Sequence, residues 1–198
     1  MAATPTPALA AAAPRIKRWR ACATLCLALL LAAGAAPPCR AQAGAPASEE
    51  AVKAAYLLKL RNYVEWPPAA LAAQGGKLVI GVIGGDEVAG RLLELAAARA
   101  DARLVVRRLR AGEALDGVAI VFIDDAHWRK AGATLALARA SPVLVVSESA
   151  GALDGGSIIN FRIVDERIRF EISLANAEHS GLKLSSGLLA LAVAVVRK

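Results

Sequence analysis

The sequence predicts an α/β fold, in which a mainly parallel sheet flanked by helices is followed by a C-terminal antiparallel hairpin and a helical tail. Short apolar runs alternate with helical stretches between residues 77 and 146, as is typical of parallel strands that are covered on both faces. After residue 158, apolar and polar residues alternate one by one, which is typical of antiparallel strands with one exposed face.

Residues 1–41 have the order of a secretory signal peptide. A basic stretch at 15–20 precedes an apolar run at 21–36, and small residues at cleavage spacing follow. The run is shorter than the roughly 20 residues of a membrane-spanning helix, and Pro37-Pro38 ends it. We therefore expect cleavage and export to the periplasm. Acylation of Cys39, which would make the chain a lipoprotein, is the weaker alternative.

Cleavage changes the charge and the cysteine content. It removes five basic residues and no acidic one, so the net charge falls from +7 to +2, and we expect no nucleic-acid partner. The rest is interpreted as a flexible lead at 42–48 and a single domain at 49–198. It is predicted to lack disulfides, reactive thiols and Cys-bound metals, because all three cysteines leave with the leader: Cys22, Cys26 and Cys39.

The domain is expected to open with a long helix. Ser48 is a suitable N-cap before Glu49, and apolar residues then recur at three- and four-residue spacing as far as Val64. The helix should stop at Trp66, because Pro67-Pro68 cannot continue it and should form an extended corner.

The middle of the domain is expected to alternate strands and helices. Gly84-Gly85 should form a turn, and Asp86 should cap the helix that follows it. Strands are predicted at 77–83, 118–123 and 143–146, with a less regular edge strand at 102–109 and a helical stretch at 126–139.

The end of the chain is predicted to form a hairpin and two helical pieces. Asp165-Glu166 separates the two alternating strands, which we place at an edge of the sheet with Asn160, Arg162, Arg169 and Glu171 pointing outward. The two helical pieces are expected at 173–179 and 186–196, and the second is interpreted as a buried helix.

The carboxyl ends of the parallel strands form the crevice in which α/β proteins bind ligands. Gly84, Gly85, Asp124 and Ser147 are expected there and make a small-ligand-binding module one possible function. A phosphate site is disfavoured relative to a plain turn, because the expected capping carboxylate stands where a phosphate would bind. A cation held by Asp86, Asp124 and Asp125 is likewise weaker than helix capping.

No pattern in the sequence predicts an enzyme. His127 and His179 stand alone on presumed helices, without a serine-hydrolase or zinc-protease motif, so we predict a non-enzymatic protein without cofactors. Trp66 and Trp128 are either interface anchors or packed corners. A group of arginines fits either an acidic partner or protection of an edge strand: Arg103, Arg107, Arg108 and Arg110.

Two stretches resemble the YfiR-type family of exported bacterial proteins. The first is Ala54-Ala55-Tyr56-Leu57 followed by Tyr63-Val64-Glu65-Trp66-Pro67. The second runs from Gly155-Gly156-Ser157-Ile158-Ile159-Asn160-Phe161 through Arg169-Phe170-Glu171-Ile172 to Ser180-Gly181-Leu182-Lys183-Leu184-Ser185-Ser186. Together with the unit between them, the resemblance covers nearly all of residues 50–196.

The resemblance implies a periplasmic repressor that binds the outer domain of an inner-membrane diguanylate cyclase. It also implies a homodimer and relief of repression by an outer-membrane lipoprotein, after which cytoplasmic cyclic di-GMP rises. Disulfides seen in some members are not expected here. The motif positions that serve as candidate partner-binding residues are Glu65, Trp66, Asn160, Arg169 and Glu171.

Overall fold

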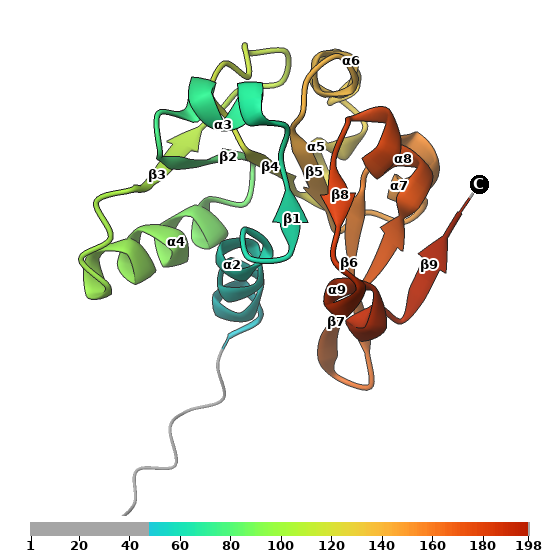
Figure 1. The fold of residues 1–198 in the computed structure, drawn as a ribbon. Coiled ribbons are helices and arrows are strands. Elements are labelled where there is room, and N and C mark those ends of the chain that lie inside the picture. The colour runs from blue at the N-terminus through green and yellow to red at the C-terminus, as the bar shows by residue number, and fades with distance from the viewer. Residues whose placement is uncertain (1–47, 198) are drawn as a thin grey trace, which may run out of the picture. The chain divides into compact units, whose positions relative to one another are not determined.

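The structure, a computed structural model, describes residues 48–197 (Figure 1). A seven-stranded sheet with strand order β3-β2-β4-β5-β6-β7-β9 forms its centre, and a small β1-β8 pair lies apart from it. The strands are β1 Val64–Glu65, β2 Leu78–Ile83, β3 Leu104–Arg108, β4 Ile120–Ile123, β5 Leu144–Ser147, β6 Ile159–Val164, β7 Arg167–Ser173, β8 Lys183–Leu184 and β9 Ala194–Val196. The helices are α2 Glu49–Leu60, α3 Pro68–Gln74, α4 Asp86–Ala98, α5 Asp125–Trp128, α6 Gly132–Arg139, α7 Ala152–Gly155, α8 Leu174–His179 and α9 Ser186–Leu191.

The sheet confirms the predicted α/β class. In the sheet, the five consecutive strands β3, β2, β4, β5 and β6 are parallel to one another. Strands β6 and β7 form the predicted antiparallel hairpin. Its turn is made by Asp165 and Glu166, whose φ angles of 50° and 58° are those of the tight turn that best matches the twist of paired strands.

The inner parallel strands β2, β4 and β5 are buried on both faces, which explains their continuous apolar runs. Ile80, Val82 and Phe122 pack in one core cluster with residues of α2 and α4. Val121 and Ile123, which alternate with Phe122 along β4, pack in the second cluster with residues of α5 and α6.

The expected first helix is wrong in its C-terminal part. It ends at Leu60, and Val64–Glu65 becomes strand β1, which pairs antiparallel with Lys183–Leu184. This pairing across the chain overrides the helical spacing of the apolar residues. The proline corner also begins a helix: Pro68 is the first residue of α3, where its missing N–H is no loss.

The predicted terminal helix over 186–196 is also wrong. Helix α9 stops at Leu191, and Ala194–Val196 forms β9, parallel to β7. Only Leu188 of α9 is buried. The hairpin is therefore not an edge of the sheet, because β9 covers the outer side of β7. The stretch 126–139 is likewise divided, into α5 and α6.

Substitutions at Trp66 test whether this residue is a packed corner. Its side chain is 9% exposed, and its indole N–H has no acceptor within residues 48–197. We expect Trp66→Ala to lower the free energy of unfolding by about 3–5 kcal/mol, because a large cavity opens. Trp66→Phe should cost clearly less, because no hydrogen bond is lost. Urea unfolding measures both, and an equal loss for the two variants contradicts this account.

Candidate functional site

The predicted crevice lies where the order of strands reverses. The chain passes from β2 to β3 on one side of β2 and then crosses to β4 on the other. The carboxyl ends of β2 and β4 therefore flank the switch point at which open α/β sheets bind ligands. Gly84 and Gly85 follow β2, and Asp124 follows β4, so the fold brings these three predicted residues together.

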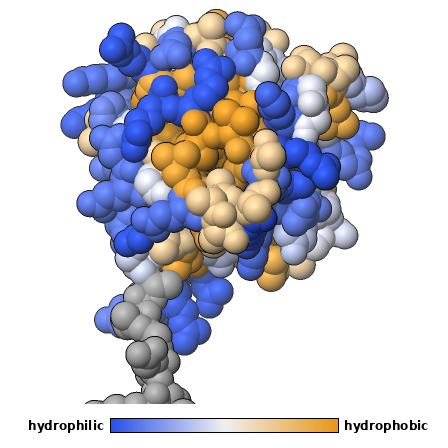
Figure 2. Space-filling model, turned by 90° about the vertical axis from the view of Figure 1, so that its left-hand side faces the viewer, coloured by the Kyte–Doolittle hydropathy of each residue, from blue (hydrophilic) through white to orange (hydrophobic). Residues whose placement is uncertain are grey.

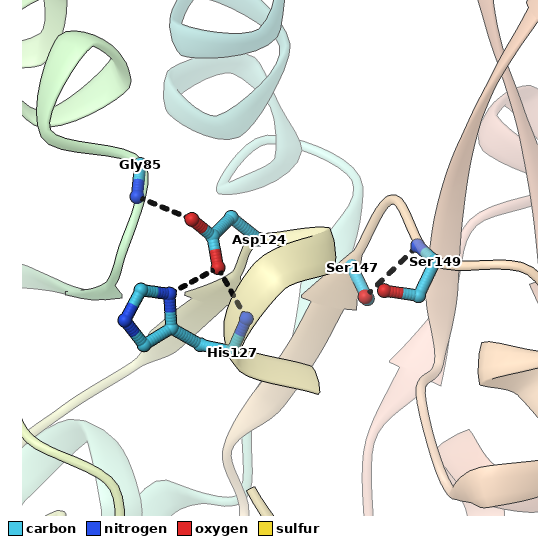
Figure 3. Close-up of polar contacts among 5 residues, drawn as sticks. All are labelled: Gly85, Asp124, His127, Ser147 and Ser149. Carbon is cyan, nitrogen blue, oxygen red and sulfur yellow. Dashed lines mark hydrogen bonds and ion pairs between the residues drawn. The ribbon is translucent and has the colours of Figure 1, made fainter. Parts of the chain in front are cut away.

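The carboxylate of Asp124 fills this crevice (Figure 3). Its Oδ2 accepts a hydrogen bond from the Gly85 N–H at 2.9 Å, and its Oδ1 accepts one from the His127 N–H at 2.9 Å. The His127 ring contacts the same oxygen through Nδ1 at 2.6 Å. The backbone donors that a phosphate would need are thus already bound to a residue of the protein itself.

Gly84 allows this close approach. A Cβ at Gly84 would lie 2.3 Å from both Asp124 Oδ2 and His127 Nδ1, and Gly84 has φ of +67°. Gly85, and not the expected Asp86, is the N-cap of α4, and Asp86 is the first residue of that helix. Asp86 can then reach Arg108, and its Oδ1 lies 3.1 Å from Arg108 Nε. Both glycines have positive φ and form the connection between β2 and α4.

Ser147 lies on the adjacent strand β5 and is buried. Its Oγ accepts a hydrogen bond from the Ser149 N–H at 3.3 Å, and Figure 3 shows these two serines apart from the Asp124 cluster. Within residues 48–197, no three His, Cys, Asp or Glu side chains come together as a metal ion requires.

A second feature near the carboxyl end of β5 was not predicted. Lys53 of α2 is only 7% exposed and forms ion pairs with Glu49 and Glu148. Burial alone lowers the pKa of its ammonium, but the hydrogen bonds that the ammonium donates to the Glu148 and Glu49 carboxylates outweigh this effect and raise the pKa. The three residues line a cleft of about 380 Å³. The four-residue spacing of Glu49 and Lys53 on one helix could have predicted the ion pair between them.

The candidate partner-binding residues form two separate groups. Glu65 and Trp66 belong to the corner between β1 and α3, where Glu65 is exposed and lies opposite Lys183 in the strand register. Asn160 and Glu171 are register partners on the hairpin, and Arg169 lies two pairs further on, opposite Arg162. No hydrogen bond or ion pair joins the two groups in the part of the chain that the structure describes.

The hairpin residues differ in exposure from the prediction. Asn160 is 1% exposed, so the expectation that it points to solvent is wrong. Arg169 is exposed and Glu171 is half-buried, 3.9 Å from Arg162. Helix α7 contacts β6 and β7, and Asn176 of α8 ties the same region together by donating to the Leu153 and Ser157 carbonyls. Alternation alone does not reveal that helices cover this face.

Comparison with known protein families identifies the family to which the sequence belongs. The DUF4154 family model, described as YfiR/HmsC-like, matches residues 50–193. The chain belongs to the YfiR/HmsC-like family. No curated protein matches the sequence.

Membership of the YfiR/HmsC-like family, which is regulatory and non-catalytic, points to a periplasmic role in cyclic di-GMP signalling. Among the helices placed by the structure, none is both long and apolar enough to cross a bilayer. The predicted signal peptide lies outside the described residues.

Gly84→Ala tests how closely Asp124 and His127 pack against Gly84. The new Cβ overlaps Asp124 and His127 and is strained at positive φ, so we expect a loss of more than about 2 kcal/mol in the free energy of unfolding. Gly90→Ala is the matched control, because its Cβ meets no atom within 4 Å and the residue lies in α4. The control should be neutral or gain up to about 1 kcal/mol. Equal Tm values for the two variants contradict the geometry.

Asn160→Leu tests whether the side chain of Asn160 stabilises the folded domain. Neither its Oδ1 nor its Nδ2 has a partner among residues 48–197, so a leucine of similar size should raise the free energy of unfolding by about 1 kcal/mol. Asn176→Leu is the comparison, because Asn176 donates two hydrogen bonds to carbonyls and its loss should cost about 1–3 kcal/mol. A Tm that falls for both variants shows that Asn160 stabilises the fold.

Proposed function

We propose that the chain is a periplasmic, non-enzymatic regulator that binds and represses an inner-membrane signalling protein. The target is the periplasmic sensor domain of a diguanylate cyclase, so that binding keeps cytoplasmic cyclic di-GMP low. An outer-membrane lipoprotein that competes for the regulator relieves the repression. Cleavage of residues 1–41 delivers the domain to the periplasm, where it works as a homodimer.

The match to the YfiR/HmsC-like family over residues 50–193 carries this proposal. The crevice supports it, because Asp124 occupies the place at which an anionic ligand or substrate would bind in this class of fold. A domain whose usual ligand site is closed by its own carboxylate is better suited to signal through its outer surface.

The exposed members of the two residue groups are the proposed contacts with the partner. Glu65 offers a carboxylate at the β1 corner, and Arg169 and Glu171 offer opposite charges on the hairpin. Such charges steer encounter and select partners more than they add affinity. Trp66 and Asn160 are buried, so neither is proposed as a direct contact; Trp66 packs beneath the β1 corner that carries Glu65.

The second candidate is a small-ligand-binding module at the carboxyl edge of the sheet, near Gly84, Gly85, Asp124 and Ser147. The cleft of about 380 Å³ beside Lys53 favours it, because that volume lies within the usual range for small-molecule sites. A thermal-shift screen of residues 42–198 checks this candidate. A compound that raises the Tm of the native chain but not of Lys53→Met supports it, and a screen without a stabilising compound counts against it.

The function is tested by measuring cyclic di-GMP in a strain that lacks the gene. We expect its level to rise on deletion, because the cyclase loses its repressor. The full-length gene should restore the low level, and a version without residues 1–41 should fail, since it is not exported. Unchanged cyclic di-GMP on deletion rules out a cyclase as the target, and rescue by the leaderless version rules out action in the periplasm.

A further inference from the structure

A groove lies at the opposite end of the sheet from the crevice, where β2 and β3 begin. Its volume is about 550 Å³, and its apolar lining comes from the β1 corner, α3 and β2: Val64, Trp66, Leu71 and Leu78. Leu71 is 49% exposed, whereas the other three are buried. Figure 2 views the side of the molecule on which α3, α4 and β3 lie, and it shows an apolar area surrounded by hydrophilic side chains.

The rim of this groove is basic. It carries Arg61, Lys77 and Arg103 but only one carboxylate, that of Glu65. Arg61 is paired with Asp101 at 3.3 Å. Of the ion pairs formed within residues 48–197, none includes Lys77 or Arg103. Two uncompensated cations therefore stand beside an exposed leucine.

We propose that this groove binds an extended acidic segment of the partner protein. Carboxylates of the segment pair with Lys77 and Arg103, and an apolar side chain between them covers Leu71. The inference rests on the proposed function, because it names the surface and the partner chemistry through which such a regulator acts. It also gives the Glu65–Trp66 corner a role, since both residues line the groove.

Charge and shape favour a peptide over other occupants. A bilayer presents a broad surface, whereas this site is a groove. A second copy of the chain would bring the same basic rim against itself in a two-fold interface, which like charges oppose. A peptide with carboxylates on both sides of a leucine meets both the cations and the apolar lining.

The direct test uses residues 42–198 and a short fluorescent peptide of alternating glutamate and leucine, read by anisotropy. We expect binding that weakens with added salt, because exposed charges are screened. Lys77→Glu with Arg103→Glu should weaken it by roughly tenfold or more, and Lys77→Gln with Arg103→Gln by less. The matched control is Arg129→Glu with Lys130→Glu, which changes two exposed cations next to α5 and should leave affinity unchanged.

Several results overturn the proposal. These are absence of peptide binding, equal loss in the control, and tighter binding to vesicles of anionic phosphatidylglycerol than to the peptide. A mass by light scattering that falls from dimer to monomer in Lys77→Glu with Arg103→Glu would assign the groove to a second copy instead. Thermal melts that match the unaltered chain show that each variant is folded, as expected for exposed positions.

The same variants in the deletion strain separate this proposal from the proposed function. Repression of cyclic di-GMP by the control pair but not by Lys77→Glu with Arg103→Glu supports the groove. Repression by both pairs overturns the groove and leaves the regulator intact. If even the unaltered gene has no effect on cyclic di-GMP, the proposed function fails, and the peptide measurement alone decides whether the groove binds acidic segments.

Discussion

The carboxylate of Asp124 joins three separate segments at the switch point of the sheet. It follows β4, accepts from Gly85 at the start of α4, and accepts from His127 at the start of α5. Helix starts leave backbone N–H groups without partners, and one side chain satisfies two of them here. This contact ties the start of α4 to the end of β4, while the helix itself packs in the main core through Val88 and Leu92. Gly84 is required because a Cβ there would overlap the Asp124 carboxylate.

Much of the parallel part of the fold could be predicted from the sequence, because strands buried on both faces leave continuous apolar runs that no surface element shows. The errors lie where pairing between distant segments decides the outcome. Val64 follows the spacing of α2, yet it pairs with Leu184. Val195 is part of an apolar run that is compatible with a helix, yet it pairs with Ile172. Local periodicity cannot choose between helix and strand for such short runs.

The position of the candidate site could be predicted from the sequence, but the hydrogen bonds made there could not. Strand order places Gly84, Gly85 and Asp124 together, and the sequence favoured a plain turn over a phosphate site. That Asp124, and not Asp86, supplies the capping carboxylate depends on a contact between residues 39 positions apart. Burial of Asn160 was missed for a similar reason, since the contacts of α7 with β6 and β7 are not visible in the alternation of residues. The Lys53 ion pair with Glu148 joins α2 to the loop after β5. Only the other ion pair of Lys53, with Glu49 four residues earlier, is visible in the sequence.

The pairing of β1 with β8 has a consequence for how the domain folds. It joins Val64–Glu65 to Lys183–Leu184, so the corner that holds Trp66 is completed only when nearly the whole domain has been synthesised. Closing so long a loop has an entropic cost before any contact repays it, and folds rich in such contacts form slowly. Until then, the backbone edge of β1 stays uncovered. A chain that waits for its last segments in this way is suited to recognition by chaperones and transport through a membrane while still unfolded, and it is open to proteases for the same interval.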